Sequence, residues 1–176
     1  MPIHPADHEI RYTSAQACEA AGIPSDTFKN WIMRHPPAIL LTDKERKNNG
    51  RGRPMMLSFT RIMHITLTAE LNRLGMAPRP AAMAAAAFTD TNRGAAHGGW
   101  VGEETPPHRL PGQLFPQGTT LLLVTGASDT QMLADCICIT PKTPVADLLA
   151  QLAACIVVDV NAFDLRVRTV LGHRSQ

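Results

Sequence analysis

The stretch from Tyr12 to Trp31 constrains the fold of this chain more than any other part of the sequence. Thr13 offers a hydroxyl cap at the start of a short helix, whose small Ala residues let a second helix approach closely. Gly22 can take the left-handed conformation that a tight turn between helices requires, and Pro24 suits the start of the next helix. The sequence therefore predicts two short helices joined by a turn, the second over about residues 25–34.

The second helix is amphipathic, because Phe28, Trp31 and Ile32 fall on one stripe and leave the polar side chains directed outward. These outward residues are of the types that read bases or hold phosphates in DNA. A helical hairpin with an ordinary solvated face is the alternative interpretation. The candidate DNA contacts on these two helices are Thr13, Ser25, Asp26, Thr27, Lys29, Asn30 and Arg34.

Two short apolar runs, Ala38–Leu41 and Met55–Phe59, are suited to strands. The segment between them is rich in Lys, Arg, Asn and Gly, so we expect a β-hairpin with a basic tip. From residue 29 to residue 61 there are eight Lys and Arg against two Asp and Glu, although the whole chain carries a net charge of only +2. A local basic patch of this kind steers a protein onto a polyanion. The candidate DNA contacts in the hairpin are Lys44, Arg46, Lys47, Arg51 and Arg53.

Within the predicted hairpin, residues 51–54 (Arg-Gly-Arg-Pro) match the core of an AT-hook. In that element two arginines flank a glycine small enough to lie deep in a narrow, A·T-rich minor groove. One alternative is a wing that grips the DNA backbone beside the recognition helix. The other is a turn in which the glycines supply flexibility and the arginines stay in solvent.

A helical apolar pattern continues from Ile62 to Leu74 and ends at Gly75, and an Ala-rich helix follows through Phe88. In this order of elements, residues 10–89 resemble the winged helix-turn-helix of MerR-type regulators. The resemblance is carried by Tyr12-Thr13, the Gly22-Ile23 turn, Thr27 with Trp31, and Arg73-Leu74-Gly75.

This resemblance implies a sequence-specific transcriptional regulator that binds double-stranded DNA as a homodimer, at a palindromic or repeated operator. Thr27, Lys29 and Asn30 would lie near the DNA and the wing arginines on its backbone, with RNA polymerase or another DNA-bound protein as a further partner. MerR-type regulators continue into a long coiled-coil helix, whereas residues 91–112 are rich in Gly, Pro and His and carry no heptad pattern. The same winged fold occurs in small terminase subunits and excisionases of phages. A phage or mobile-element DNA-binding component is therefore the alternative function.

The second half predicts a smaller α/β-type domain, so the whole chain is expected to be α+β. Strands are expected over 119–125, 133–140 and 155–160, and helices over 145–152 and 162–171. We expect this half to dimerise, because each half is near the lower size limit of an independent domain. The residues that would lie either at the subunit interface or in an internal core are Leu165, Val167, Val170 and Leu171. The expected organisation is a flexible tail at 1–10, a winged helix-turn-helix domain at 11–90, a Gly/Pro-rich linker at 91–113 and a C-terminal domain at 114–176.

Residues 124–128 (Val-Thr-Gly-Ala-Ser) look like the opening of a dinucleotide-binding loop, but the later glycines that let a backbone approach pyrophosphate are missing. Cys136 and Cys138 fall on one strand face, and we interpret them as buried cysteines rather than a zinc or redox pair. The sequence contains no nucleophile–base or paired-carboxylate arrangement, so we expect no enzyme activity, no cofactor and no bound metal. Four cysteines without regular spacing, no signal peptide and no membrane-spanning apolar run predict a cytoplasmic protein.

Overall fold

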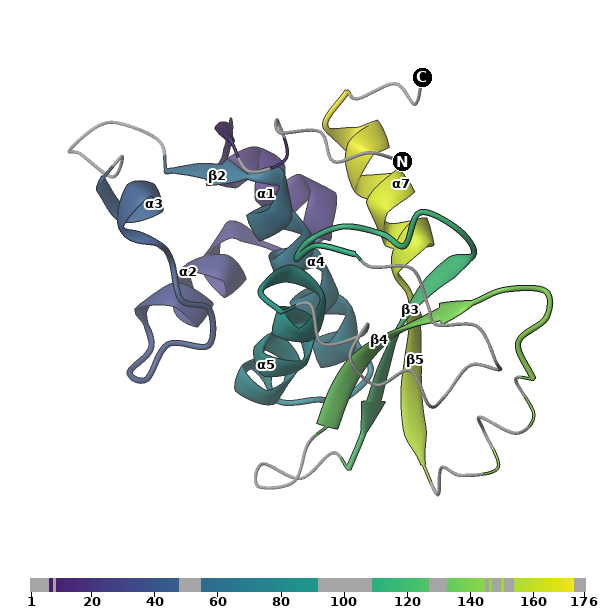
Figure 1. The fold of residues 1–176 in the computed structure, drawn as a ribbon. Coiled ribbons are helices and arrows are strands. Elements are labelled where there is room, and N and C mark those ends of the chain that lie inside the picture. Colours follow the sequence, from purple (N-terminus) through teal and green to yellow (C-terminus); the bar gives the residue numbers. More distant parts are fainter. Residues whose placement is uncertain are drawn as a thin grey trace. The chain divides into compact units, whose positions relative to one another are not determined.

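The structure is a computed structural model that describes residues 7, 9–47, 55–91, 109–126, 133–144, 146, 150 and 154–172. Helices and antiparallel strands occur together in it, so the predicted α+β class is confirmed (Figure 1). The chain divides into two compact units. We call residues 3–82 with 163–176 the helical unit, and residues 1–2 with 83–162 the sheet unit.

The helical unit is built around α4 (Phe59–Arg73), most of whose side chains are buried. The hydroxyl of Ser58 accepts a hydrogen bond from the amide of Arg61 at 3.1 Å and so caps the start of this helix. Gly75 follows its end in a left-handed conformation, as the sequence predicts. The other elements of the unit are β1 (Ile10–Thr13), α1 (Ser14–Ala21), α2 (Ser25–Met33), α3 (Asp43–Lys47), β2 (Met56–Ser58), the first part of α5 (Pro78–Thr89) and most of α7 (Val160–Val170).

The turn between α1 and α2 has the capping that its sequence predicts. The Thr13 hydroxyl accepts from the amide of Gln16 at 3.3 Å, and the Gln16 side chain accepts from the amide of Thr13 at 2.9 Å. This reciprocal pair is a capping box. Gly22 has a φ of 67°, and the amide of Ile23 donates to the carbonyl of Cys18 at 3.0 Å, which closes the end of α1. The two predicted helices and their boundary are therefore confirmed.

The predicted strand at 38–41 is wrong. Its amides turn back onto α2 instead: those of Ala38 and Ile39 both donate to the carbonyl of Trp31, at 2.8 and 3.2 Å. That carbonyl lies in the last turn of α2 and has no partner within its own helix. Strand β2 pairs antiparallel with β1, where Tyr12 lies opposite Leu57, so the predicted hairpin between the two apolar runs does not form.

Residues 43–47, predicted to lie in the basic hairpin, form the short helix α3. The Glu45 carboxylate accepts from the amide of Thr42 at 2.7 Å, and the Thr42 hydroxyl accepts from the amide of Glu45 at 3.4 Å. The sequence Thr-x-x-Glu is the signature of a capping box, so the signal for this helix was present in the sequence. Residues 48–54, which carry the AT-hook match, lie outside the described residues.

Both ends of the chain depart from the expected domain boundaries. Ile10, predicted to belong to the tail, begins β1, and the Asp7 carboxylate accepts from the Arg168 guanidinium at 2.9 Å. Arg168 lies on α7, so the C-terminal helix contributes to the helical unit from residue 163 onward instead of staying with a module at 114–176. The same guanidinium donates to Asp164 at 2.8 Å and lies 4.0 Å from the centroid of the Phe59 ring. Of the four apolar residues proposed for an interface, Val167 is buried, Leu171 is half-buried, and Leu165 and Val170 are exposed.

The sheet unit contains a three-stranded antiparallel sheet in the order β4-β3-β5, formed by β3 (Thr119–Thr125), β4 (Leu133–Ile139) and β5 (Cys155–Asp159). The three predicted strands are confirmed. In the register of the sheet, Leu122 lies opposite Cys136 on one side and Val158 on the other, and all three side chains are buried. The predicted helix at 145–152 falls mostly outside the described residues.

The end of the predicted linker is packed into the sheet unit. Residues 92–108 lie outside the described residues, but Arg109 is buried. Its guanidinium donates to the carbonyls of Ala87 and Phe88, at 2.7 and 3.0 Å, at the C-terminal end of α5. It also lies within 6 Å of the rings of Phe88 and Phe115, at 5.3 and 5.8 Å from their centroids. A cation at this position satisfies helix carbonyls that have no partner within the helix.

Candidate nucleic-acid interface

Helix α2 has one buried face and one exposed polar face. Phe28 and Trp31 are buried, whereas Asp26, Lys29 and Asn30 are exposed. Residues three and four apart lie on the same side of a helix, so these three polar side chains form one stripe. The turn at Gly22 and the hydrogen bonds of Ala38 and Ile39 hold the two ends of this helix. The stripe is therefore presented on a helix whose backbone is fixed at both ends.

Two charges on this stripe form an ion pair with each other. Lys29 Nζ lies 3.1 Å from Asp26 Oδ1, and the two side chains are 62% and 88% exposed. A pair this exposed is weak and is screened by salt, so the Lys29 ammonium can exchange Asp26 for a phosphate. The Asp26 carboxylate, in turn, places a negative charge on the same face.

Three of the other predicted contact residues, on α2 and at the cap of α1, have partners in the protein or are partly covered. The Thr13 hydroxyl takes part in the cap of α1. Ser25 is exposed, but it hydrogen-bonds the Cys18 thiol; burial raises the pKa of this thiol, while Ser25 and the charge of Lys29 act in the opposite direction. Thr27 is half-buried. The fully outward stripe is therefore smaller than the sequence alone suggests.

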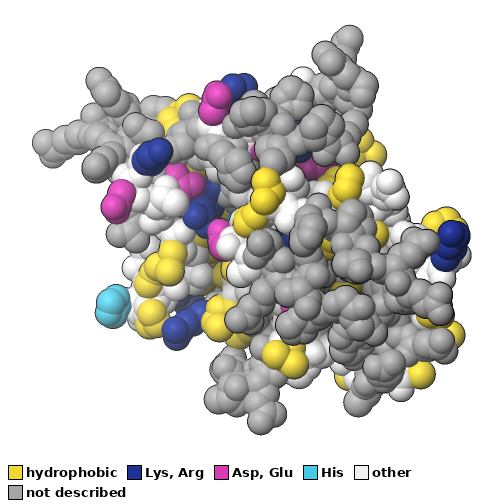
Figure 2. Space-filling view, viewed as in Figure 1, with side chains coloured by type: hydrophobic (Ala, Val, Ile, Leu, Met, Phe, Trp, Pro, Cys, Tyr) yellow, Lys and Arg dark blue, Asp and Glu magenta, His cyan; other side chains and the backbone are white. Residues whose placement is uncertain are grey.

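The basic residues beyond α2 are only partly described. Arg34, just past α2, and Lys44, on α3, are exposed. Arg46 and Lys47 belong to α3, but their side chains lie outside the described residues, as Arg51 and Arg53 do entirely. Over α2 and α3, Figure 2 shows acidic side chains interspersed with basic ones. The described part of the surface therefore has mixed charge.

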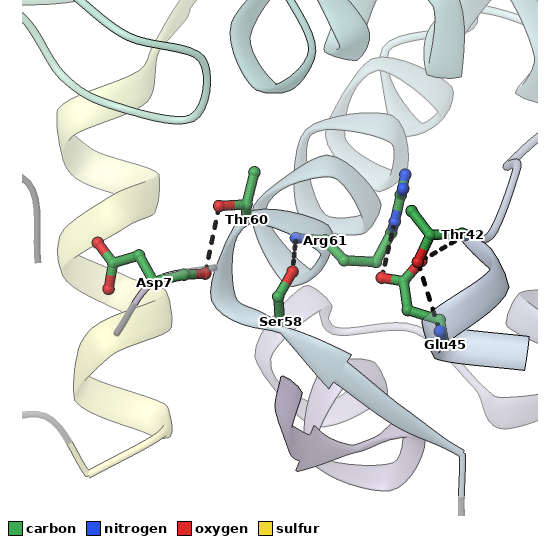
Figure 3. A network of polar contacts seen from close by, with 6 residues as sticks. All are labelled: Asp7, Thr42, Glu45, Ser58, Thr60 and Arg61. Atoms are coloured by element: carbon green, nitrogen blue, oxygen red, sulfur yellow. Dashed lines mark hydrogen bonds and ion pairs between the residues drawn. The ribbon is translucent and has the colours of Figure 1, made fainter. Parts of the chain in front are cut away.

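Arg61, which the sequence counts toward the basic patch, is not part of this surface. Its Nε lies 3.2 Å from Glu45 Oε1, with the two side chains only 11% and 3% exposed (Figure 3). The other carboxylate oxygen accepts from the amide and hydroxyl of Thr42, at 2.7 and 2.9 Å. The carboxylate of Glu45 thus joins the start of α3 to α4, and charge counting along the sequence did not reveal this link.

The exposed stripe of α2 also contains a residue that the sequence analysis missed. Met33 is 79% exposed and follows Asn30 by three positions and Asp26 by seven. This spacing places Met33 on the polar stripe. The helical period that places Met33 there is visible in the sequence, but polar residue types alone predict DNA contacts without it.

The described residues also include histidines, cysteines and carboxylates, the side chains that bind metals. No group of three or more His, Cys, Asp or Glu side chains that could hold a metal ion occurs in the described part of the chain. Cys136 and Cys138 are buried, as predicted, and burial raises the pKa of Cys136 to about 11. Within the described ranges, no helix combines the length and apolar character needed to cross a membrane.

In comparisons with known proteins, no family model matches this chain, and no curated protein matches it either. The residues of α2 and the elements that hold it are therefore the features that indicate a function.

Proposed function

We propose that this chain is a sequence-specific DNA-binding protein in which α1, the Gly22 turn and α2 form a helix-turn-helix, with α2 in the major groove. The observation that carries this proposal is the division of α2 into a buried face, with Phe28 and Trp31, and an exposed face, with Lys29 and Asn30. A helix with its side chains is about 10–12 Å wide, close to the width of the major groove of B-DNA, about 12 Å. Asp26, Lys29 and Asn30 are all exposed, so their side chains are available to base edges and phosphates.

The side chains on this face match the chemistry of base edges. The Asn30 amide has a donor and an acceptor that suit the N7 and N6 atoms of adenine. The Lys29 ammonium suits the O6 and N7 atoms of guanine or a phosphate, and the Asp26 carboxylate can accept from the amino group of cytosine. The exposed Arg34 and Lys44 are placed beyond α2, where we assign them to phosphates.

We assign the segment between α3 and β2 to the wing of a winged helix-turn-helix. It carries Arg51 and Arg53, and its flanking elements have defined positions in the helical unit. On one side, Glu45 ties α3 to α4 through Arg61; on the other, β2 pairs with β1. Basic side chains on such a segment would grip the backbone or minor groove beside the site that α2 reads.

In the cell we assign the protein the role of a cytoplasmic transcriptional regulator that acts as a homodimer on an inverted repeat. Each protomer would place one α2 in the major groove of one half-site, so the half-site centres would be about one helical turn apart. Leu165 and Val170 on α7 are exposed apolar residues that a second protomer could cover.

The test is selection of bound fragments from a randomised DNA pool by the purified full-length protein at near-physiological salt. We expect an inverted repeat to be enriched. The affinity of the protein for that repeat is then measured by fluorescence anisotropy across a series of salt concentrations. Lys29→Ala removes one lysine contact from each half-site, so it should weaken binding about tenfold and lower the slope of log affinity against log salt by about 2. Lys142→Ala, which removes an exposed lysine from the sheet unit, is the matched control and should change neither.

Two results would count against the proposal. If the wild-type protein enriches no DNA at all, the assignment of DNA binding is wrong. Enrichment of A·T-rich DNA without any motif, with no effect of Lys29→Ala, would instead favour an architectural or packaging role based on the wing.

A further inference from the structure

Met33 is exposed on α2, but its side chain has no polar group that could hydrogen-bond to a base edge. Its side chain is 79% exposed, although Met is a residue type that is usually buried. A single exposed apolar residue on a surface is common, but the position of this one is specific. It lies on the same stripe as Asp26, Lys29 and Asn30, at the C-terminal end of the face that we place in the major groove.

We propose that Met33 contacts the 5-methyl group of a thymine and makes the protein prefer an A·T pair at that position. This inference rests on the proposed function, because it requires α2 to lie in the major groove. The thymine methyl is the apolar group that the major-groove edge offers to a protein. An unbranched, polarisable thioether side chain adapts its shape to such a group.

The position of Asn30 supports this assignment. Asn30 precedes Met33 by three residues, which corresponds to about 4.5 Å along the helix axis, a little more than the 3.4 Å between successive bases of one strand. The two side chains therefore reach the same or neighbouring base pairs. An amide suited to adenine beside a thioether suited to thymine predicts that each half-site contains one A·T pair read by both side chains, or two consecutive A·T pairs.

The surroundings of Met33 keep its backbone in place and make the approach of DNA favourable. The amide of Arg34 donates to the carbonyl of Asn30 at 3.1 Å, which closes the last turn of α2. The exposed guanidinium of Arg34 lies next to Met33 in the chain, and the exposed ammonium of Lys29 lies one turn before it. Two cations beside an exposed apolar side chain complement a methyl group that is flanked by phosphates.

The experiment uses the site that the full-length protein selects and replaces each thymine in turn by uracil, which removes the 5-methyl group and leaves the base-pairing edge unchanged. At one position, the affinity of the wild-type protein should fall about fourfold, as expected for one methyl group no longer buried. Met33→Ala removes this contact from both half-sites of the homodimer, so on thymine DNA its affinity should fall by about the square of that factor, roughly 16-fold. The variant should be insensitive to uracil at that position. Met33→Leu should retain most of the sensitivity.

The matched control is Met83→Ala on α5, which removes another exposed methionine (58% exposed) that is not part of the stripe and should leave the uracil effect intact. Circular dichroism verifies that the variants are folded. If Met33→Ala still shows the full uracil penalty, or if no thymine-to-uracil change affects the wild type, the inference is wrong while DNA binding stands. If the wild type selects no DNA, the proposed function fails, and the role of Met33 fails with it.

Discussion

Replacing Glu45 by Ala should destabilise the helical unit by about 3 kcal/mol, because this carboxylate serves two structures at once. It accepts two hydrogen bonds from Thr42 in the capping box of α3, and loss of such a cap costs about 1 kcal/mol. It also pairs with Arg61 at 3.2 Å, and removal of one partner of a fully buried pair costs about 3–5 kcal/mol. Arg61 is 11% exposed and can recover some hydration, so we take about 2 kcal/mol for this second contribution.

The assay is urea denaturation followed by tryptophan fluorescence in a Trp100→Phe background, so that the signal comes from Trp31, which is buried in the same unit. Glu45→Gln keeps an acceptor for the amide of Thr42 but removes the charge, so it should cost roughly half as much as Glu45→Ala. The matched control is Glu19→Ala, which removes an exposed glutamate from α1 and should change the free energy of unfolding by less than about 0.5 kcal/mol.

A double-mutant cycle separates the ion pair from the cap. Glu45→Gln combined with Arg61→Met should cost less than the sum of the two single changes, by at least about 1 kcal/mol, because neither charge is then left unpaired. Additive costs, or a loss below about 1 kcal/mol for Glu45→Ala, would show that the two side chains are solvated, and our account of how α3 is held would be refuted.

Three further predictions concern the turn, the exposed face and the thiols. Gly22→Ala should lower the free energy of unfolding by about 1–2 kcal/mol in urea denaturation, because Gly22 has a φ of 67°, which a residue with a Cβ rarely adopts. The added Cβ would meet no atom within 4 Å, so the cost comes from the backbone conformation and not from a clash. Gly22→Asn should recover part of that loss, and an unchanged stability of Gly22→Ala would contradict the observed turn. On DNA of random sequence, where no base contact of Asp26 is at stake, Asp26→Asn should strengthen binding in anisotropy titrations at low salt, since it removes a negative charge and frees Lys29. An equal or weaker affinity for that DNA would argue against DNA on this face. A thiol reagent at neutral pH should modify the partly exposed Cys155 first and the fully buried Cys136 only on unfolding, and persistence of the fast phase in Cys155→Ser would refute this order. Because burial raises the pKa of Cys136 from 9.0 to about 11, the contribution of this thiol to stability is full below pH 9 and is lost as the pH rises toward 11; Cys136→Ala should remove that part of the pH dependence.

Helix boundaries were the features that the sequence predicted best, since the groups that cap a helix are close together in the chain. Thr13 with Gln16 and the left-handed Gly22 bound α1, and Gly75 follows α4, as expected from their residue types. The Thr42–Glu45 capping box is equally local. The basic residues around it are also typical of a hairpin tip, which is why the sequence analysis predicts a hairpin there, although the signal for α3 is present.

The pairing of strands was the feature that the sequence did not determine. An apolar run such as 38–41 has the composition of a strand, but a strand also needs a partner for its amides and carbonyls. The partner of β2 is β1, more than 40 residues earlier, while the amides of Ala38 and Ile39 go to Trp31. Local pattern contains no information about which of these partners is nearest in space.

For the candidate site, the sequence by itself determined the amphipathic helix, the tight turn before it and the residue types on its outer face, since all three depend on periodicity and on the conformational preferences of single residues. Only the tertiary structure decided which of those residues remain available. It showed that Arg61 is paired with a buried Glu45 and that Met33 stands in solvent among polar neighbours. It also placed Arg168 beside Asp7, a contact across 161 residues. Burial and ion pairing depend on which side chains are close in space, and the packing of the helical unit around α4 determines those contacts.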